Sequence, residues 1–168
     1  MYDVSRESPY AFLSEEEIRA WYAYMKVQLR LRYEMTRQLR VEHDLSLADY
    51  DVLVALLSDD RGVMSVSDVA VRIGAERSRV SHQVRRMAGR GLVTLRSSAD
   101  DRRATEVVLS DVGREALGAA TPSHVALVRS VFLDALSDTQ TRQLAEALEQ
   151  VYENLIAHGT LPRPADHP

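Results

Sequence analysis

Residues 75–93 read AERSRVSHQVRRMAGRGLV, and the interpretation of the whole chain starts from this stretch. Val80, Val84 and Met87 recur at the spacing of an α-helix, which predicts that one side of that helix is buried. The other side carries hydroxyl, imidazole and guanidinium groups, from Arg77, Ser78, Arg79, Ser81, His82, Arg85 and Arg86. Such a helix packs by one face and offers the other to the DNA major groove. Taken alone, the stretch also permits a solvated helix with surplus arginines.

The neighbouring segments favour the DNA-binding interpretation. Residues 65–74 are predicted to form a short helix that precedes the arginine-rich one. After it, LVTLRS (92–97) and TEVVL (105–109) are predicted to be strands joined by the polar turn SADDRRA (98–104). We therefore expect a mainly α protein with a small β-hairpin wing, in which residues 46–110 form a winged helix-turn-helix lobe. Candidate DNA contacts on the wing are Arg96, Asp101, Arg102 and Arg103.

Long helices are predicted on both sides of this lobe. Ser14 and the three glutamates after it form a capping box with acids in the first turn, which predicts a helix over residues 14–42. This helix and those predicted within residues 111–158, the last of which starts at Ser137, carry surplus apolar surface. We interpret both regions as dimerisation helices. Residues 159–168 are rich in helix breakers and are predicted to be a flexible tail.

The first helix after the wing is predicted to be short. Ser110 precedes an aspartate and is the expected N-cap, and the helical pattern reaches about Leu117. Gly118 and Pro122 follow, and a proline inside a helix removes a backbone donor. We therefore expect a kink or an interruption before the apolar segment 125–136.

Charge is distributed unevenly along the chain. The net charge is −4 at pH 7, yet residues 72–103 hold nine arginines and only three acidic residues, a local charge of +6 against −10 for the remainder. A basic block on an acidic body is expected to attract phosphates at one face and to repel DNA elsewhere. Because the block is all arginine, planar forked contacts are favoured over point charges.

Several function classes find no support in the sequence. The chain has no cysteine, which excludes disulfides and thiolate zinc sites. Its histidines lack metal-ligand spacing and it has no nucleotide-binding or hydrolase motif, so we expect no metal, no cofactor and no enzymatic activity. The adjacent Ser123 and His124 are interpreted as loop residues rather than a catalytic pair. Without a long apolar run or a signal peptide, we expect a cytoplasmic protein with no membrane span.

Three motifs occur in order along the chain, namely LSLADYDVLVALLSD (45–59), RSRVSHQVRRMAGRGLV (77–93) and DDRRATEVVLSDVGREAL (100–117). By these motifs the sequence, over about residues 15–158, resembles the MarR family of bacterial transcription regulators. The resemblance implies a homodimer that places each recognition helix in a major groove. It also implies that a wing arginine enters the neighbouring minor groove.

The resemblance also suggests roles for single residues. Arg103 matches the wing-tip arginine by position, and Asp101 matches the acid that braces it, although Asp101 also fits a plain turn residue. Arg96 fits a phosphate contact or a solvated strand position better than a base contact. Family members often carry acids near the positions of Arg85 and Ala88. Their absence here implies a helix that binds more backbone and reads fewer bases.

Many members of the family release DNA when a small phenolic or aromatic carboxylate binds between the dimer layer and the DNA-binding lobe. In this chain Tyr24, Gln28 and Tyr50 are the candidates for such a pocket. Packing in the core or the dimer is the alternative role for these side chains.

We therefore expect a sequence-specific transcriptional regulator, a repressor released by a small aromatic or phenolic ligand. It is expected to bind a pseudo-palindromic double-stranded operator as a homodimer. An effector-independent architectural DNA-binding protein is the first alternative. A module whose basic helix docks an acidic protein partner is the second.

Overall fold

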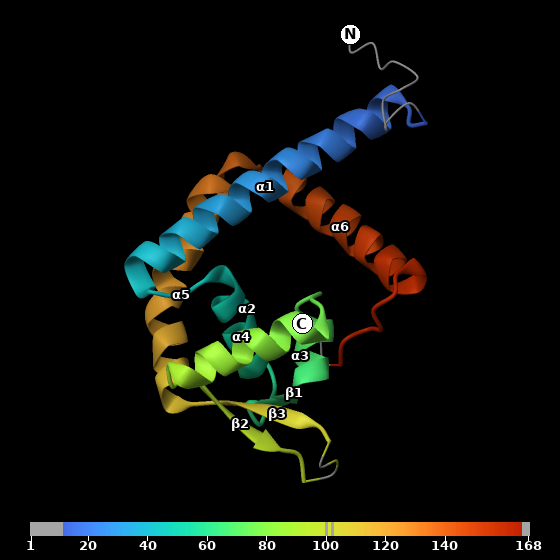
Figure 1. Cartoon of the computed structure of the whole chain (residues 1–168). Coiled ribbons are helices and arrows are strands. Elements are labelled where there is room, and N and C mark those ends of the chain that lie inside the picture. The colour runs from blue at the N-terminus through green and yellow to red at the C-terminus, as the bar shows by residue number, and fades with distance from the viewer. Residues whose placement is uncertain (1–11, 100, 102, 166–168) are drawn as a thin grey trace.

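A computed structural model describes residues 12–99, 101 and 103–165 of the chain (Figure 1). Its elements are, in order, α1 (Glu15–His43), α2 (Leu47–Leu57), β1 (Val63–Ser65), α3 (Val66–Arg72), α4 (Arg77–Gly89), β2 (Val93–Ser97), β3 (Thr105–Leu109), α5 (Asp111–Val131), the 3-10 helix η1 (Leu133–Ala135) and α6 (Asp138–His158). Figure 1 shows α2, α3, α4 and the sheet at one end of the molecule and α1 at the other, with α5 running between them. The predicted fold class, mainly helical with a small β wing, is confirmed.

Serine N-caps define where the long helices begin. Ser14, Ser46 and Ser137 each form a capping box, in which the serine and the third helical residue exchange side-chain to backbone hydrogen bonds. Ser110 caps α5 by accepting a hydrogen bond of 2.9 Å from the backbone N–H of Gly113. A serine cap stabilises a helix by about 1 kcal/mol. The helix starts predicted at Ser14, Ser110 and Ser137 are confirmed, because capping is a local effect.

The core lies in the lobe, where the inner sides of α2, α3 and α4 meet the sheet. Its largest fully buried side chains are Leu39, Leu45, Val52, Leu53, Leu56, Val69, Val80, Val84, Met87, Val93 and Val107. Val80, Val84 and Met87 are the residues whose spacing predicted the buried side of α4. Burying a valine or leucine fully contributes about 1.5–3 kcal/mol. This packing fixes α4 on the lobe and thereby fixes its outward face as well.

The wing sheet has three strands instead of the two that were predicted. β1 pairs antiparallel with β3, with Val63 opposite Val108 and Ser65 opposite Glu106, and the strand order is β1-β3-β2. Three residues are too few to show an alternating pattern, so the sequence did not indicate β1. Ser65 ends this strand and also caps α3, since its side chain accepts a hydrogen bond from the N–H of Asp68.

The helix α5 continues through Pro122, so the interruption predicted before residues 125–136 does not occur, and the kink stays a prediction. Proline removes the N–H that would bond the carbonyl group of Gly118. Gly118 is exposed, so water can bond that carbonyl group instead. Ala120 and His124, on either side of the proline, are buried where α5 packs against α1 and α2. Tertiary packing therefore holds the helix together at a position where local sequence disfavours it.

By length and composition alone, residues 111–135 could also cross a membrane. The mean hydropathy of this segment reaches 1.2 over eighteen residues. A core helix of a globular lobe meets the same criterion, and α5 packs against two neighbouring helices. One such helix is weak support for a membrane span.

The helix α6 is the least packed element. None of its residues is buried, and it makes few contacts with any other element. Leu148, Val151 and Leu155 recur along one side and are 45%, 55% and 61% exposed. An amphipathic helix with an uncovered apolar side has not completed its packing within one chain.

The segment after α6 returns toward the lobe. Arg163 forms an ion pair with Glu153 of α6, and the carbonyl oxygen of Ala165 accepts a hydrogen bond of 2.7 Å from Arg72 of α3. These two contacts tie down the described part of a segment that was predicted to be a flexible tail. Residues 166–168 lie outside the described residues.

Candidate nucleic-acid interface

The outward face of α4 carries the predicted recognition residues. Six of the seven are exposed and Ser81 is half-buried. With about 100° of rotation per residue, the buried Val80, Val84 and Met87 mark one side of the helix. The seven residues that lie outside that side are Arg77, Ser78, Arg79, Ser81, His82, Arg85 and Arg86.

The same rotation divides this face into a ridge and two flanks. Ser78, His82 and Arg85 point most directly away from the core and form the ridge. Arg79 and Arg86 lie on one flank, and Arg77 and Ser81 lie on the other. A helix that enters a groove presents its ridge to the base edges, while its flanks face the walls of the groove, where a short side chain meets phosphate and a long one reaches a phosphate or a base edge.

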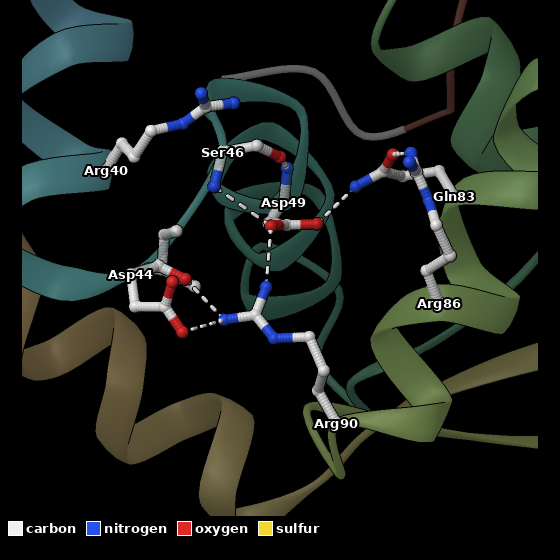
Figure 2. A pocket seen from close by; sticks show the side chains of 8 residues that line it. Arg40, Asp44, Ser46, Asp49, Gln83, Arg86 and Arg90 are labelled. Atoms are coloured by element: carbon white, nitrogen blue, oxygen red, sulfur yellow. Dashed lines mark hydrogen bonds and ion pairs between the residues drawn. The ribbon is translucent and has the colours of Figure 1, made fainter.

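An acidic side chain of α2 holds the C-terminal half of α4. Asp49 is buried, and its Oδ2 atom accepts a hydrogen bond of 3.1 Å from Nη1 of Arg90. The carboxylate also accepts a bond from the side-chain amide of Gln83, which is itself buried (Figure 2). Arg90 makes a second ion pair, of 3.2 Å, with Asp44 at the end of α1. The orientation of α4 is therefore set by polar bonds as well as by its apolar side.

These groups line an open pocket of about 240 Å³ beside α4 (Figure 2). The lining residues are Arg40, Asp44, Leu45, Ser46, Asp49, Gln83, Arg86 and Arg90. The sequence analysis did not identify Asp49 or Gln83 as functional residues. A signal for Asp49 was present, since it follows Ser46 by three residues, as in a capping box. No sequence pattern pointed to Gln83.

On the wing, Arg96 is paired within the sheet. Arg96 of β2 lies opposite Glu106 of β3 in the antiparallel register, and its Nε atom donates a hydrogen bond of 2.8 Å to Oε2 of Glu106. This hydrogen bond lowers the pKa of Glu106 below its ordinary value, and a hydrogen bond with Ser98 adds a smaller effect in the same direction. A guanidinium whose charge is already paired is a weaker DNA ligand than a free one.

The turn between β2 and β3 carries the remaining wing candidates. Oδ1 of Asp101 accepts a hydrogen bond of 2.9 Å from the backbone N–H of Arg103, and the carbonyl oxygen of Asp101 accepts one of 2.8 Å from Ala104. Asp101 therefore shapes the turn that presents Arg103 by contacting its backbone. The side chain of Arg103 is exposed. The fourth wing candidate, Arg102, lies outside the described residues.

The candidate ligand residues do not form one site within a single chain. Tyr24 is about half exposed and packs beside Trp21, with 5.7 Å between the ring centroids. Gln28 is half-buried on the same helix. Tyr50 instead lies against His124 of α5, at 4.4 Å between centroids. The part of α1 that contacts His124 is Gln38. Tyr24 lies several turns before Gln38 on this helix, at 5.4 Å per turn.

Around Tyr50 the structure assembles polar groups that the sequence did not place together. Ser123 and His124 lie within the helix α5 and not in a loop, which corrects the prediction. Ser123 Oγ is 2.7 Å from Nε2 of His43 and accepts a hydrogen bond of 2.9 Å from Gln38. His124 Nδ1 lies 3.3 Å from Oε1 of Gln38, and burial lowers the pKa of His124, with a smaller effect from the neighbouring His43. This cluster joins α1, α2 and α5 where the long helices meet the lobe.

Metal ligands do not gather anywhere in the described part of the chain. Within residues 12–99, 101 and 103–165, no group of three or more histidine, aspartate or glutamate side chains could hold a metal ion.

Comparisons with known proteins agree with this geometry. A family model described as MarR family matches residues 43–104. The structure of AbsC, a MarR family transcriptional regulator from Streptomyces coelicolor, has 32% identity and a TM-score of 0.81, over 87% of this chain and 98% of that one. Sco3205, a MarR family regulator from the same organism solved in complex with DNA, has 30% identity and a TM-score of 0.83, over 89% and 94% of the two chains. Among curated proteins, the HTH-type transcriptional repressor IacR of Pseudomonas putida is 29% identical over 135 residues, 80% of this chain and 78% of that protein.

Proposed function

This chain belongs to the MarR family, whose members are DNA-binding transcriptional regulators and not enzymes, and we propose that it acts as a homodimeric repressor. Each subunit inserts α4 into the major groove of a double-stranded operator and places Arg103 in the adjacent minor groove. The observation that supports this most is the division of α4, whose inner side is locked in the core while its outer side carries seven polar or basic side chains. The protein acts in the cytoplasm.

The proposed dimer uses the uncovered apolar sides of the long helices. On α6 these are Leu148, Val151 and Leu155, and on the N-terminal half of α1 they include Trp21 and Leu29, which are 45% and 62% exposed. Apolar surface of this kind is stabilised when a second copy covers it. A two-fold dimer presents its two recognition helices to one face of the duplex, with half-sites about 34–36 Å apart. The expected operator is therefore pseudo-palindromic.

Different parts of α4 have different tasks in this proposal. Arg85 and His82 on the ridge face the base edges, where an arginine that bonds guanine O6 and N7 discriminates by about 1–3 kcal/mol. The short hydroxyl group of Ser81, on a flank, suits phosphate oxygens. Arg103 gains from the negative potential of a narrow, A·T-rich minor groove.

Repression and ligand release complete the proposal. IacR, a relative of similar length, is itself named as a transcriptional repressor. We propose that a small aromatic or phenolic ligand shifts the lobe relative to the dimer helices. The polar cluster around Tyr50 and His124 supports this, because it joins α1 and α5 to the start of α2. The dimer then has two states, one whose recognition helices are spaced to fit the operator and one whose helices are not. A ligand that binds the second state more tightly lowers DNA affinity by the ratio of its affinities for the two states.

One experiment separates this function from the alternatives. The full chain selects duplexes from a randomised library, and binding to the selected duplex and to an unrelated one is then measured by gel shift at low and moderate salt. A sequence-specific regulator enriches a two-fold symmetric site and retains it as salt is raised. Equal binding to all duplexes, lost steeply with salt, identifies an architectural protein. No shift at low salt identifies a protein-docking module.

A further inference from the structure

The carboxylate of Asp49 bonds to three parts of the lobe at once. Its Oδ2 atom accepts hydrogen bonds of 2.9 Å from the backbone N–H of Ser46 and of 3.1 Å from Arg90, while its Oδ1 atom accepts one from the side-chain Nε2 of Gln83 (Figure 2). Asp49 is 4% exposed and Gln83 is 7% exposed, so water has little access to either group. The start of α2 is thereby bonded to both the middle and the end of α4.

The charge of Asp49 determines which way the Gln83 amide points. An ionised carboxylate only accepts hydrogen bonds, so Gln83 must turn its NH₂ group toward Asp49. The amide oxygen then points the other way, where it accepts a hydrogen bond from Nη2 of Arg86. With the amide reversed, its oxygen would face a carboxylate and its NH₂ group would face a guanidinium. Two favourable bonds would be exchanged for two repulsive contacts.

Arg86 and Arg90 are used differently by this arrangement. The charge of Arg90 is paired with Asp44 and Asp49, so Arg90 is a brace within the protein. Within the described residues, the side chain of Arg86 bonds only to the neutral oxygen of Gln83 and has no acidic partner. The side chain of Arg86 is exposed on the same flank of α4 as Arg79. The hydrogen bond to Gln83 thus orients the guanidinium of Arg86, and no acidic side chain neutralises its charge.

We propose that Asp49 and Gln83 are positioning residues for DNA recognition, which orient the guanidinium of Arg86 toward one base pair of each half-site. An arginine that bonds a base in forked geometry must be oriented as well as charged, because both of its hydrogen bonds depend on the plane of the guanidinium. A relay that starts from a buried carboxylate supplies that orientation. This inference rests on the proposed function.

A double-mutant cycle tests the relay. Gln83→Met keeps the length of the side chain and removes both of its hydrogen bonds, and Arg86→Met removes the guanidinium. Each variant and the double variant are assayed on the duplex that the wild type selects and on all its single-base substitutions, with thermal unfolding measured alongside. Arg86→Met is expected to lose discrimination at one base pair per half-site. Gln83→Met is expected to lose about tenfold of the discrimination at that same base pair.

The cycle distinguishes positioning from a merely structural role. If Gln83 acts through Arg86, then Gln83→Met has no further effect on base preference in the Arg86→Met background. A loss of affinity that is equal for all duplexes, or one that persists in that background, overturns the inference. So does an Arg86→Met protein with unchanged base preferences. If Gln83→Met does not fold, Asp49→Asn serves instead, since it removes the charge that directs the amide and leaves Gln83 in place.

The failure of this inference can be told apart from failure of the proposed function. Arg103 lies on the wing, outside the relay, and Arg103→Ala reports on DNA binding independently. If Arg103→Ala weakens binding while Gln83→Met changes no preference, the relay is wrong and the function stands. If the wild type selects no duplex at all, both are wrong.

Discussion

Gly113 packs directly against the backbone carbonyl group of Leu92. A Cβ atom on Gly113 would lie 2.0 Å from the carbonyl oxygen of Leu92 and 3.1 Å from Cδ1 of Leu109. The start of α5 therefore approaches the start of β2 more closely than any side chain permits. Ser110 strengthens the same junction, since its hydroxyl group donates a hydrogen bond of 2.6 Å to the carbonyl oxygen of Gly91. This junction joins the wing to the helix that leads back to α1.

Gly113→Ala is expected to destabilise the protein by about 3 kcal/mol, because backbone must move to admit the methyl group. Gly118→Ala is the matched control on the same helix, since nothing lies within 4 Å of a Cβ atom there. That control is expected to stabilise the protein by about 0.4–1 kcal/mol. Urea unfolding of both variants measures the two changes in free energy. Equal effects of the two substitutions would contradict the close approach.

Arg103→Ala is expected to weaken operator binding about tenfold, because the proposed contact of the wing-tip guanidinium with the minor groove is lost. If Arg103 meets a phosphate, the slope of log affinity against log salt also falls by about one. Arg142→Ala, on the exposed surface of α6, removes the same charge far from the wing and is the control. Fluorescence anisotropy with the selected duplex measures both. Unchanged affinity of the Arg103 variant would refute the wing assignment.

Stability is expected to fall as the pH is lowered from about 7.5 to about 5.5, with His124 as the cause. Burial lowers the pKa of His124 in the folded chain below its ordinary value of 6.5, so the unfolded chain binds a proton first. The neutral imidazole therefore contributes stability that is complete above pH 6.5 and is lost as the pH falls through that value. The groups that face His124 are Tyr50, Gln38 and His43. The hydrogen bond from Gln38 lowers the pKa of Glu42, which confines the effect of Glu42 to more acidic solutions.

Urea unfolding of the wild type and of His124→Gln across this pH range measures the contribution. The variant is expected to show a smaller decline in stability, because the titrating group is gone. If both proteins lose stability equally between the two pH values, the decline has another origin.

Leu148→Glu is expected to convert the proposed dimer to a monomer, because it places a charge in the apolar side of α6 that a second copy would cover. Leu57→Glu is the matched control, since Leu57 is 48% exposed and Leu148 is 45% exposed, but Leu57 lies at the end of α2 in the lobe. Light scattering after size-exclusion chromatography gives the mass of each. A wild-type monomer, or a dimer that survives Leu148→Glu, would argue against α6 as a dimerisation helix.

Local patterns in the sequence predicted much of the fold. The spacing of Val80, Val84 and Met87 identified the buried side of α4, and Ser14, Ser110 and Ser137 marked helix starts. These features depend on residues within one turn of each other. They therefore form in much the same way whatever the rest of the chain does.

Features that depend on distant residues were missed. The strand β1 exists only because β3 supplies its hydrogen-bond partners, and α5 continues through Pro122 because neighbouring helices hold both of its halves. Ser123 and His124 joined a polar cluster, in which His124 is buried, only when α5 met α1. In each case the deciding energy comes from tertiary contacts that outweigh a local preference.

The sequence by itself determined which residues of α4 face outward and that the chain is a winged helix-turn-helix regulator, because helical periodicity and the order of motifs can be seen along the chain. Only the tertiary structure decided how the side chains of Arg86 and Arg90 are held. Asp49 of α2 lies 34 residues before Gln83, and their bond, which directs Arg86 and leaves Arg90 as a brace, requires the folded lobe. Hydrogen-bond direction depends on which atoms meet across space, and no spacing in the sequence encodes that.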